Sequence, residues 1–147
     1  MGKLIRTKRD YGKKRQAMPG RNEEGQSVVE MAITFPILLL LLVAIVDFAR
    51  VIDAAIVLTN AAREGARYGS RDPSLSQSDI QQLVVGDVLG SGTNITNMAD
   101  FATSNVTVQF DSSDVTVTVS YDFDLWFGGI VRLNTVHLER EAVMPKF

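Results

Sequence analysis

The chain has no cysteine, one histidine and four prolines among 147 residues. Without cysteine there is no disulfide and no thiolate metal ligand, although this absence does not decide between cytoplasmic and exported compartments. The single histidine, His137, has no visible ligand partners in the sequence, so neither a zinc site nor a catalytic site is expected around it. No nucleophile–base pattern, phosphate-binding loop or metal cluster stands out. We therefore expect a protein that is not an enzyme, with no cofactor, no metal and no small-molecule substrate.

Basic residues are also missing from Asp72 to Val131, a stretch with eight aspartates. The positive charge is gathered instead in residues 1–25, which carry eight Lys/Arg against three Asp/Glu. A basic flank beside an apolar segment favours a cytoplasmic N-terminus with the C-terminal part across the membrane. Binding of nucleic acid by this basic tail is disfavoured, because the membrane segment follows it directly. We expect residues 1–24 to be disordered, and no nucleic-acid partner.

An apolar run extends over residues 28–46, interrupted only by Glu30 and Thr34. Its length is close to the roughly 20 residues that a helix needs to span a bilayer. Pro36 lies inside the run and predicts a local kink, which neighbouring helices in a membrane tolerate. A cleaved secretory signal peptide is disfavoured, because the basic region is too long and no small-x-small site precedes Asp47.

Polar residues recur after this run at spacings near three, four and seven, which predicts that the helix continues. At about 100° per residue, polar and apolar positions fall on opposite sides. The expected polar side comprises Asp47, Arg50, Asp53, Asn60, Arg63, Glu64, Arg67 and Arg71, and the expected apolar side comprises Phe48, Val51, Ile52, Ala55, Leu58, Ala62 and Ala66. One helix is therefore predicted from Ser27 to Gly69, apolar all round in its first half and amphipathic in its second.

The remaining sequence predicts a small domain of mixed structure. A second helix is expected at residues 78–89, with Ser76 or Ser78 as its cap, followed by a loop over residues 91–104. The predicted strands, which alternate apolar and polar residues, cover 106–110, 115–123 and about 135–143, with turns at 111–114 and 128–129. The alternation implies one buried face, which the amphipathic half of the long helix would cover.

This plan resembles that of type IV pilins and pseudopilins. The segments that carry a closer resemblance are Gly25-Gln-Ser-Val-Val-Glu30-Met-Ala-Ile-Thr-Phe-Pro36, Val46-Asp-Phe-Ala-Arg50 and Asn60-Ala-Ala-Arg-Glu-Gly-Ala-Arg67. They are similar to the TadE-like family, the pseudopilins of tight-adherence (Flp) pilus systems. The resemblance covers about residues 25–70. It implies an α+β, type IV pilin-like fold, in which a long N-terminal helix packs on a small antiparallel sheet with a short second helix.

The same resemblance implies four regions: a leader (1–25), a transmembrane half of the helix (26–47), an amphipathic half (48–72) and an exported α+β domain (73–147). A prepilin peptidase would cut between Gly25 and Gln26, where glycine lets an extended backbone enter a narrow cleft. The new amino group at Gln26 would lie one turn before Glu30. In a growing filament the Glu30 carboxylate would pair with the ammonium of a neighbouring subunit in low dielectric. The alternative is a Glu30 solvated at the headgroup level.

Two departures refine the resemblance. Gln26 stands where many pilins have phenylalanine, which leaves the N-terminal modification open, and Met31 stands where Flp-type major pilins often have tyrosine. Together with the sizeable C-terminal domain, they favour a minor pilin or pseudopilin.

Ala61, Gly65 and Gly69 place a small residue at every fourth position of the long helix. Another backbone can approach such a stripe closely, either the protein's own sheet or a neighbouring subunit. Three arginines on the same helix are expected either to pair with the Asp-rich domain or to form a solvated face: Arg63, Arg67 and Arg71.

Two features of the C-terminal half allow more than one interpretation. Its aspartates lack the compact loop and regular spacing of a calcium site: Asp111, Asp114, Asp122 and Asp124. The apolar segment Leu125–Val131 is expected in the core, but an exposed Trp126 would make it a contact surface.

The leading hypothesis is a minor pilin or pseudopilin that takes part in pilus assembly and adhesion. Its partners would be a prepilin peptidase, other pilins and pseudopilins, the inner-membrane assembly platform and membrane lipid. It would lie in the bacterial inner membrane as a single-pass protein with its C-terminal domain outside, or in a cell-surface pilus. The alternative is an unprocessed single-span membrane protein with an exported binding domain.

Overall fold

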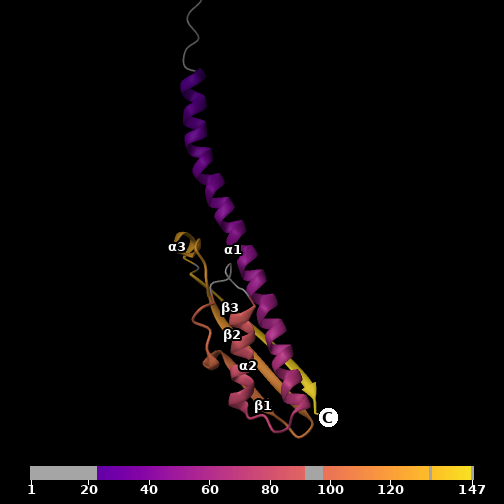
Figure 1. Ribbon diagram of the computed structural model, residues 1–147. Coiled ribbons are helices and arrows are strands. Elements are labelled where there is room, and N and C mark those ends of the chain that lie inside the picture. Colours follow the sequence, from indigo (N-terminus) through magenta and orange to yellow (C-terminus); the bar gives the residue numbers. More distant parts are fainter. Residues whose placement is uncertain (1–22, 92–97, 133, 147) are drawn as a thin grey trace, which may run out of the picture. The chain divides into compact units, whose positions relative to one another are not determined.

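The computed structural model describes residues 23–91, 98–132 and 134–146. In chain order the elements are α1 (Glu23–Arg71), α2 (Gln77–Gly90), the 3-10 helix η1 (Thr103–Asn105), β1 (Val106–Phe110), β2 (Asp114–Asp124), α3 (Gly128–Val131) and β3 (Thr135–Pro145) (Figure 1). The chain divides after Pro36 into two compact units. Residues 1–22 of the expected leader and residues 92–97 of the expected loop lie outside the described residues.

Helix α1 contributes to both units, and its bounds are close to the predicted ones. It begins four residues before Ser27, ends two after Gly69 and includes Pro36 without a break in helical assignment. Whether Pro36 kinks the helix stays a prediction. Among the described residues, α1 is the one helix long and apolar enough to cross a membrane, and its most apolar stretch has no buried residue.

The three strands form one antiparallel sheet in the order β1-β2-β3. Val119 of β2 pairs with Val106 of β1 on one side and with Arg140 of β3 on the other. Along β2, alternate side chains are buried from Val115 to Phe123, whereas the residues between them are half-buried or exposed. This is the predicted alternation with one covered face.

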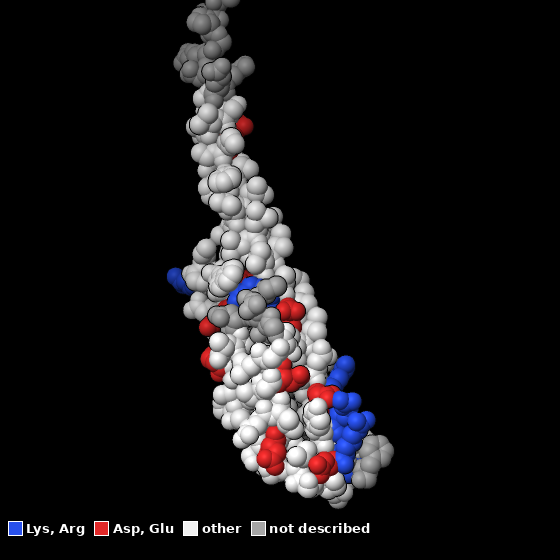
Figure 2. All heavy atoms as spheres, viewed as in Figure 1, with Lys and Arg blue, Asp and Glu red and all other residues white. Residues whose placement is uncertain are grey.

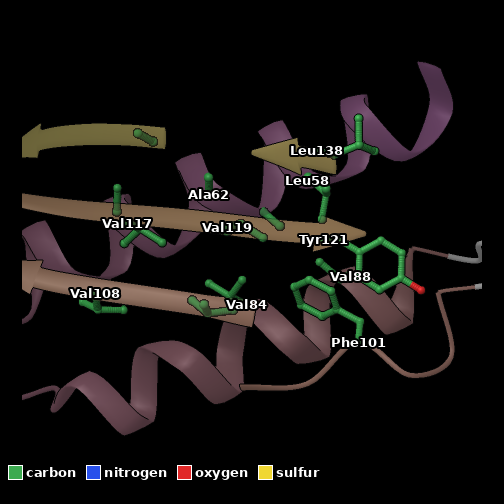
Figure 3. Packing of buried hydrophobic residues seen from close by; sticks show 14 of the residues in the cluster. Leu58, Ala62, Val84, Val88, Phe101, Val108, Val117, Val119, Tyr121 and Leu138 are labelled. Atoms are coloured by element: carbon green, nitrogen blue, oxygen red, sulfur yellow. The ribbon is translucent and has the colours of Figure 1, made fainter. Parts of the chain in front are cut away.

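Helices α1 and α2 both cover the buried face of this sheet. Figure 3 shows Leu58 and Ala62 of α1 and Val84 of α2 directed toward Val117 and Val119 of β2. The observed architecture is therefore α+β, with a long N-terminal helix packed on a three-stranded sheet beside a short second helix, which confirms the predicted fold class.

Helix α2 is fixed at its start and along one side by polar groups. Ser76 is its cap: Asp79 N donates to the Ser76 hydroxyl, and Ser76 N donates to the Asp79 carboxylate, which forms a capping box. The side-chain amides of Gln77 and Gln81 donate to the Val108 and Val106 carbonyls of β1 at 3.0 and 2.8 Å. Because β1 is an edge strand, these bonds occupy carbonyls that would otherwise be open to another chain.

The predicted faces of α1 need a correction. Phe48 and Ile52, expected on the covered side, are 69% and 45% exposed, whereas Asp47 and Arg50, expected on the wet side, are 3% exposed. Further along α1 the prediction is confirmed, because Leu58, Ala62 and Ala66 are buried. The buried residues that face the sheet and α2 are mostly small, and their sequence positions are 54, 58, 61, 62, 65, 66 and 69. Small residues allow the helix to approach closely, so they decide which side faces the domain, and the two charged residues are buried as a pair.

The turn predicted at Gly128 and Gly129 is also different in the structure. These residues begin the one-turn helix α3, and the turn back toward β3 is made by Arg132, whose φ of 60° lies in the left-handed region. The connection needs a positive φ one helical turn later than the glycines suggested.

Gly65 and Gly69 lie where α1 meets the domain most closely. A Cβ built on Gly65 would lie 2.5 Å from Val84 Cγ2 of α2, and one on Gly69 would lie 2.9 Å from Val115 Cγ1 of β2. Ala61, at the same stripe, is fully buried. Of the two partners considered for this stripe, the structure places the protein's own α2 and sheet against it.

We therefore expect Gly65→Ala to destabilise the domain, although alanine is the better helix former by about 1 kcal/mol. Overpacking costs typically 1–3 kcal/mol, and Val84 is a stiff β-branched neighbour, so the net change should be a loss of about 1 kcal/mol. Thermal unfolding of the full chain in detergent, followed by circular dichroism, measures it.

The matched control is Gly86→Ala on α2, where an added Cβ meets nothing within 4 Å. It should raise stability by about 0.5–1 kcal/mol, because only helix propensity changes. Equal effects of the two substitutions would contradict the close approach at Gly65.

Candidate functional site

The first turns of α1 carry the residues expected at the cleavage site. Gly25, Gln26 and Glu30 are all exposed, and the Gln26 side-chain amide donates to Glu30 Oε1 at 2.9 Å. The helix thus places position 26 and the carboxylate one turn apart on the same face. A Cβ built on Gly25 meets nothing within 4 Å, so no close packing within the described residues requires glycine there.

A second candidate site lies where α1 enters the domain, at Asp47 and Arg50. Arg50 Nη1 donates to Asp47 Oδ1 at 2.7 Å, and both side chains are at most 4% exposed. The second carboxylate oxygen of Asp47 accepts a 2.7 Å hydrogen bond from the backbone N–H of Phe127, 80 residues later in the chain. The pair therefore joins the helix to the segment that connects β2 with β3.

One aromatic ring of that segment and one of strand β2 lie over the Arg50 guanidinium. It lies 4.1 Å from the ring centroid of Trp126 and 4.9 Å from that of Phe123. A guanidinium stacks well on such faces and attracts the ring quadrupole. The Arg50 guanidinium therefore contacts one carboxylate and two rings, and these contacts offset the free energy that its removal from water costs.

Sequence reasoning missed this site because it assigned both charges to the wet face. One signal was available: an acidic and a basic residue three apart, directly after the apolar run, suit an intrahelical ion pair. Their aromatic partners, about 75 residues later, could not be found from spacing.

A cavity of about 310 Å³ lies beside the pair. Its lining combines the cation with carboxylates and rings, and comprises Arg50, Ala99, Asp100, Tyr121, Phe123, Asp124 and Trp126. The Tyr121 hydroxyl donates to the Asp100 carboxylate. Burial, together with this hydrogen bond, raises the pKa of Tyr121, so the phenol is neutral and acts as a donor here.

The other charged residues singled out in the sequence do not gather in one site. Arg67 pairs with Glu64 on its own helix, and Arg63 and Arg71 are exposed. Figure 2 shows basic side chains gathered near the C-terminal ends of α1 and β3, with acidic ones scattered over the rest of the visible face. Within the described ranges, no three His, Cys, Asp or Glu side chains are arranged to hold a metal ion.

Trp126 is 67% exposed, and Ile130 of α3 is 65% exposed. The exposure of Trp126 makes the segment Leu125–Val131 a candidate contact surface. The segment expected in the core is therefore divided, because Leu125 and Phe127 are half-buried while these two side chains face outward.

Comparison with known proteins supports one family. Residues 25–67 match the family model described as TadE-like protein, which confirms the resemblance found in the sequence. The match begins at Gly25 and covers α1 as far as Arg67, and it leaves the C-terminal domain unmatched. Searches of curated proteins and of solved structures found no match.

We expect Asp47→Ala to destabilise the domain by about 3–5 kcal/mol, because it leaves the buried Arg50 cation without its carboxylate. The Phe127 N–H would lose its acceptor as well. The near-ultraviolet circular dichroism of Trp126 should weaken, since the ring is ordered by Arg50. Chemical denaturation of the full chain in detergent measures the stability.

Glu64→Ala is the control, because it breaks another i,i+3 pair on α1 that is 44% and 32% exposed. It should cost less than about 1 kcal/mol. Similar losses for both substitutions would show that burial of the Asp47–Arg50 pair does not matter.

His137 gives a pH dependence. Its Nδ1 lies 2.7 Å from Asp122 Oδ1, directly across the β2–β3 ladder, and this hydrogen bond, opposed by slight desolvation, raises the pKa of His137 above its usual 6.5. A raised pKa means that the interaction stabilises the fold fully below pH 6.5 and that this contribution is lost as the pH rises through the folded-state pKa.

NMR titration of the imidazole should therefore give a midpoint above 6.5, and Asp122→Asn should lower it. Asp114→Asn, at the far end of the same strand, serves as the control and should leave it unchanged. A wild-type midpoint at or below 6.5 would contradict the pairing.

Proposed function

We propose that the chain is a minor pilin or pseudopilin of a tight-adherence pilus, cut after Gly25 by a prepilin peptidase and active in pilus assembly and adhesion. The observation that carries the proposal is the TadE-like match, whose first residue is Gly25 and which runs along a helix apolar enough to cross a membrane.

The environment of Gly25 is compatible with binding by a peptidase. A Cβ built on Gly25 meets nothing within 4 Å, as at Gly86 of α2, so packing does not hold this part of the backbone. A peptidase that binds extended backbone would benefit from the missing side chain. Gly25 lies in the first turn of α1, where unwinding breaks few hydrogen bonds.

The geometry of Gln26 and Glu30 supports the assembly step. The Glu30 carboxylate accepts a hydrogen bond from the Gln26 side chain, so it lies on the helix face that carries position 26, one turn from the amino group that cleavage would create. In a filament interior, an unpaired charge costs several kcal/mol, and the cheapest arrangement pairs each Glu30 with an ammonium of its own or of a neighbouring subunit. Pairing between subunits would set their axial register.

Charge and exposure support the proposed membrane topology. In this proposal residues 1–25 stay in the cytoplasm, residues 26–47 span the inner membrane, and residues 48–147 lie outside. The side chains of residues 25–43 are all exposed although most are large and apolar, which suits lipid and later the helices of other subunits.

Co-expression with an active prepilin peptidase should shorten the chain by the 25 residues before Gln26, as measured by N-terminal sequencing of the membrane fraction. Gly25→Ala should reduce the cleaved fraction. Glu30→Val should leave cleavage largely intact and impair pilus assembly, because the register charge is lost.

Gly86→Ala is the matched control, since this glycine also has open space but lies on α2. It should affect neither cleavage nor assembly. An intact N-terminus beside an active cognate peptidase would favour the alternative, an unprocessed single-span membrane protein. Normal piliation of the Glu30→Val strain would remove Glu30 from the mechanism.

A further inference from the structure

The segment 125–132, which includes α3 and is called the apolar tip here, presents large apolar side chains to solvent. Trp126 and Ile130 are both about two-thirds exposed, although they are among the largest apolar residues of the domain. Single exposed apolar residues need no explanation, but two on one short segment mark a contact surface.

The Asp47–Arg50 pair fixes the height of the apolar tip along α1. The Phe127 N–H binds the Asp47 carboxylate, and the Trp126 ring stacks on the Arg50 guanidinium. Asp47 is the first residue after the apolar run, so the tip is held level with the end of that run. Figure 1 shows α3 beside α1 at that end of the domain.

The composition of the apolar tip suits the boundary between lipid headgroups and acyl chains. Tryptophan is enriched at this depth because its ring is apolar and its N–H is polar. Arg132, exposed at the end of α3, is the first basic residue after Arg71 in a domain rich in aspartate. A cation beside apolar side chains complements the phosphates of anionic lipids, at about 1 kcal/mol per basic residue.

We propose that the apolar tip inserts into the headgroup region of the outer leaflet of the membrane that α1 spans, and so holds the exported domain against the bilayer before assembly. This inference rests on the proposed membrane span. A stable protein partner is the less suitable occupant, because specific interfaces bury about 800 Å² per partner and the tip offers two large side chains.

The test uses Trp126 itself, because it is the only tryptophan in the chain. The full chain is reconstituted in vesicles of phosphatidylethanolamine and phosphatidylglycerol with lipids brominated either near the headgroup or near the chain terminus. We expect Trp126 fluorescence to be quenched by the shallow bromines more than by the deep ones, and little by acrylamide. Quenching by acrylamide alone would overturn the proposal.

A second variant separates this inference from the proposed span. Trp126→Phe combined with Leu40→Trp moves the probe into the apolar run, where deep bromines should quench it. If this probe is quenched and Trp126 is not, the span holds and the tip proposal fails. If neither probe is quenched by lipid, the span fails and the tip proposal falls with it.

Surface variants test the contact directly. Ile130→Asp should abolish most lipid quenching of Trp126, whereas Leu83→Asp, at an exposed apolar position on α2, should leave it unchanged. Protection of Trp126 that rises with the protein-to-lipid ratio, without lipid quenching, would show that a second copy covers the tip and would overturn the proposal.

Discussion

The ion pair between Asp47 and Arg50 is the contact on which the arrangement of the domain depends. Two charges buried within one helical turn are costly unless every lone pair and proton finds a partner, and here the carboxylate, the Phe127 N–H and two rings supply them. The pair faces the domain only if α1 presents its stripe of small residues to the sheet. It therefore fixes both the rotation of the helix and the position of the β2–β3 connection.

The glycines of α1 lie in two different surroundings. At Gly65 and Gly69 the missing Cβ lets α1 approach α2 and β2, so the backbone is held tightly. At Gly25 the same absence leaves open space near a helix end, where the backbone unwinds at low cost. The family match spans both Gly25 and Gly65, so under the proposed processing one helix would carry a cleavage site and a close-packing site.

Periodicity predicted the helices, strands and sheet closely, because each element has one buried face and the apolar spacing records it. On α1 it failed only at the start of the amphipathic half, where residues 48 and 52 are exposed and the charged residues 47 and 50 are buried, whereas residues 58, 62 and 66 and the small residues 61, 65 and 69 face the domain as predicted. It also failed at α3, where the left-handed residue is Arg132 and not a glycine. In both places tertiary contacts, which no local pattern records, decide the outcome.

The apolar surface of residues 37–46 cannot remain in water, because every large side chain on it is at least one-third exposed. Lipid covers it before assembly in the proposed cycle, and neighbouring helices must cover it afterwards. The Asp47–Arg50 pair marks the point where α1 exchanges these surroundings for its own domain, so the charges stay masked in either setting. If both proposals hold, a subunit that leaves the bilayer gives up lipid contacts along the helix and at the apolar tip together, so the free energy of its contacts with other subunits must exceed both.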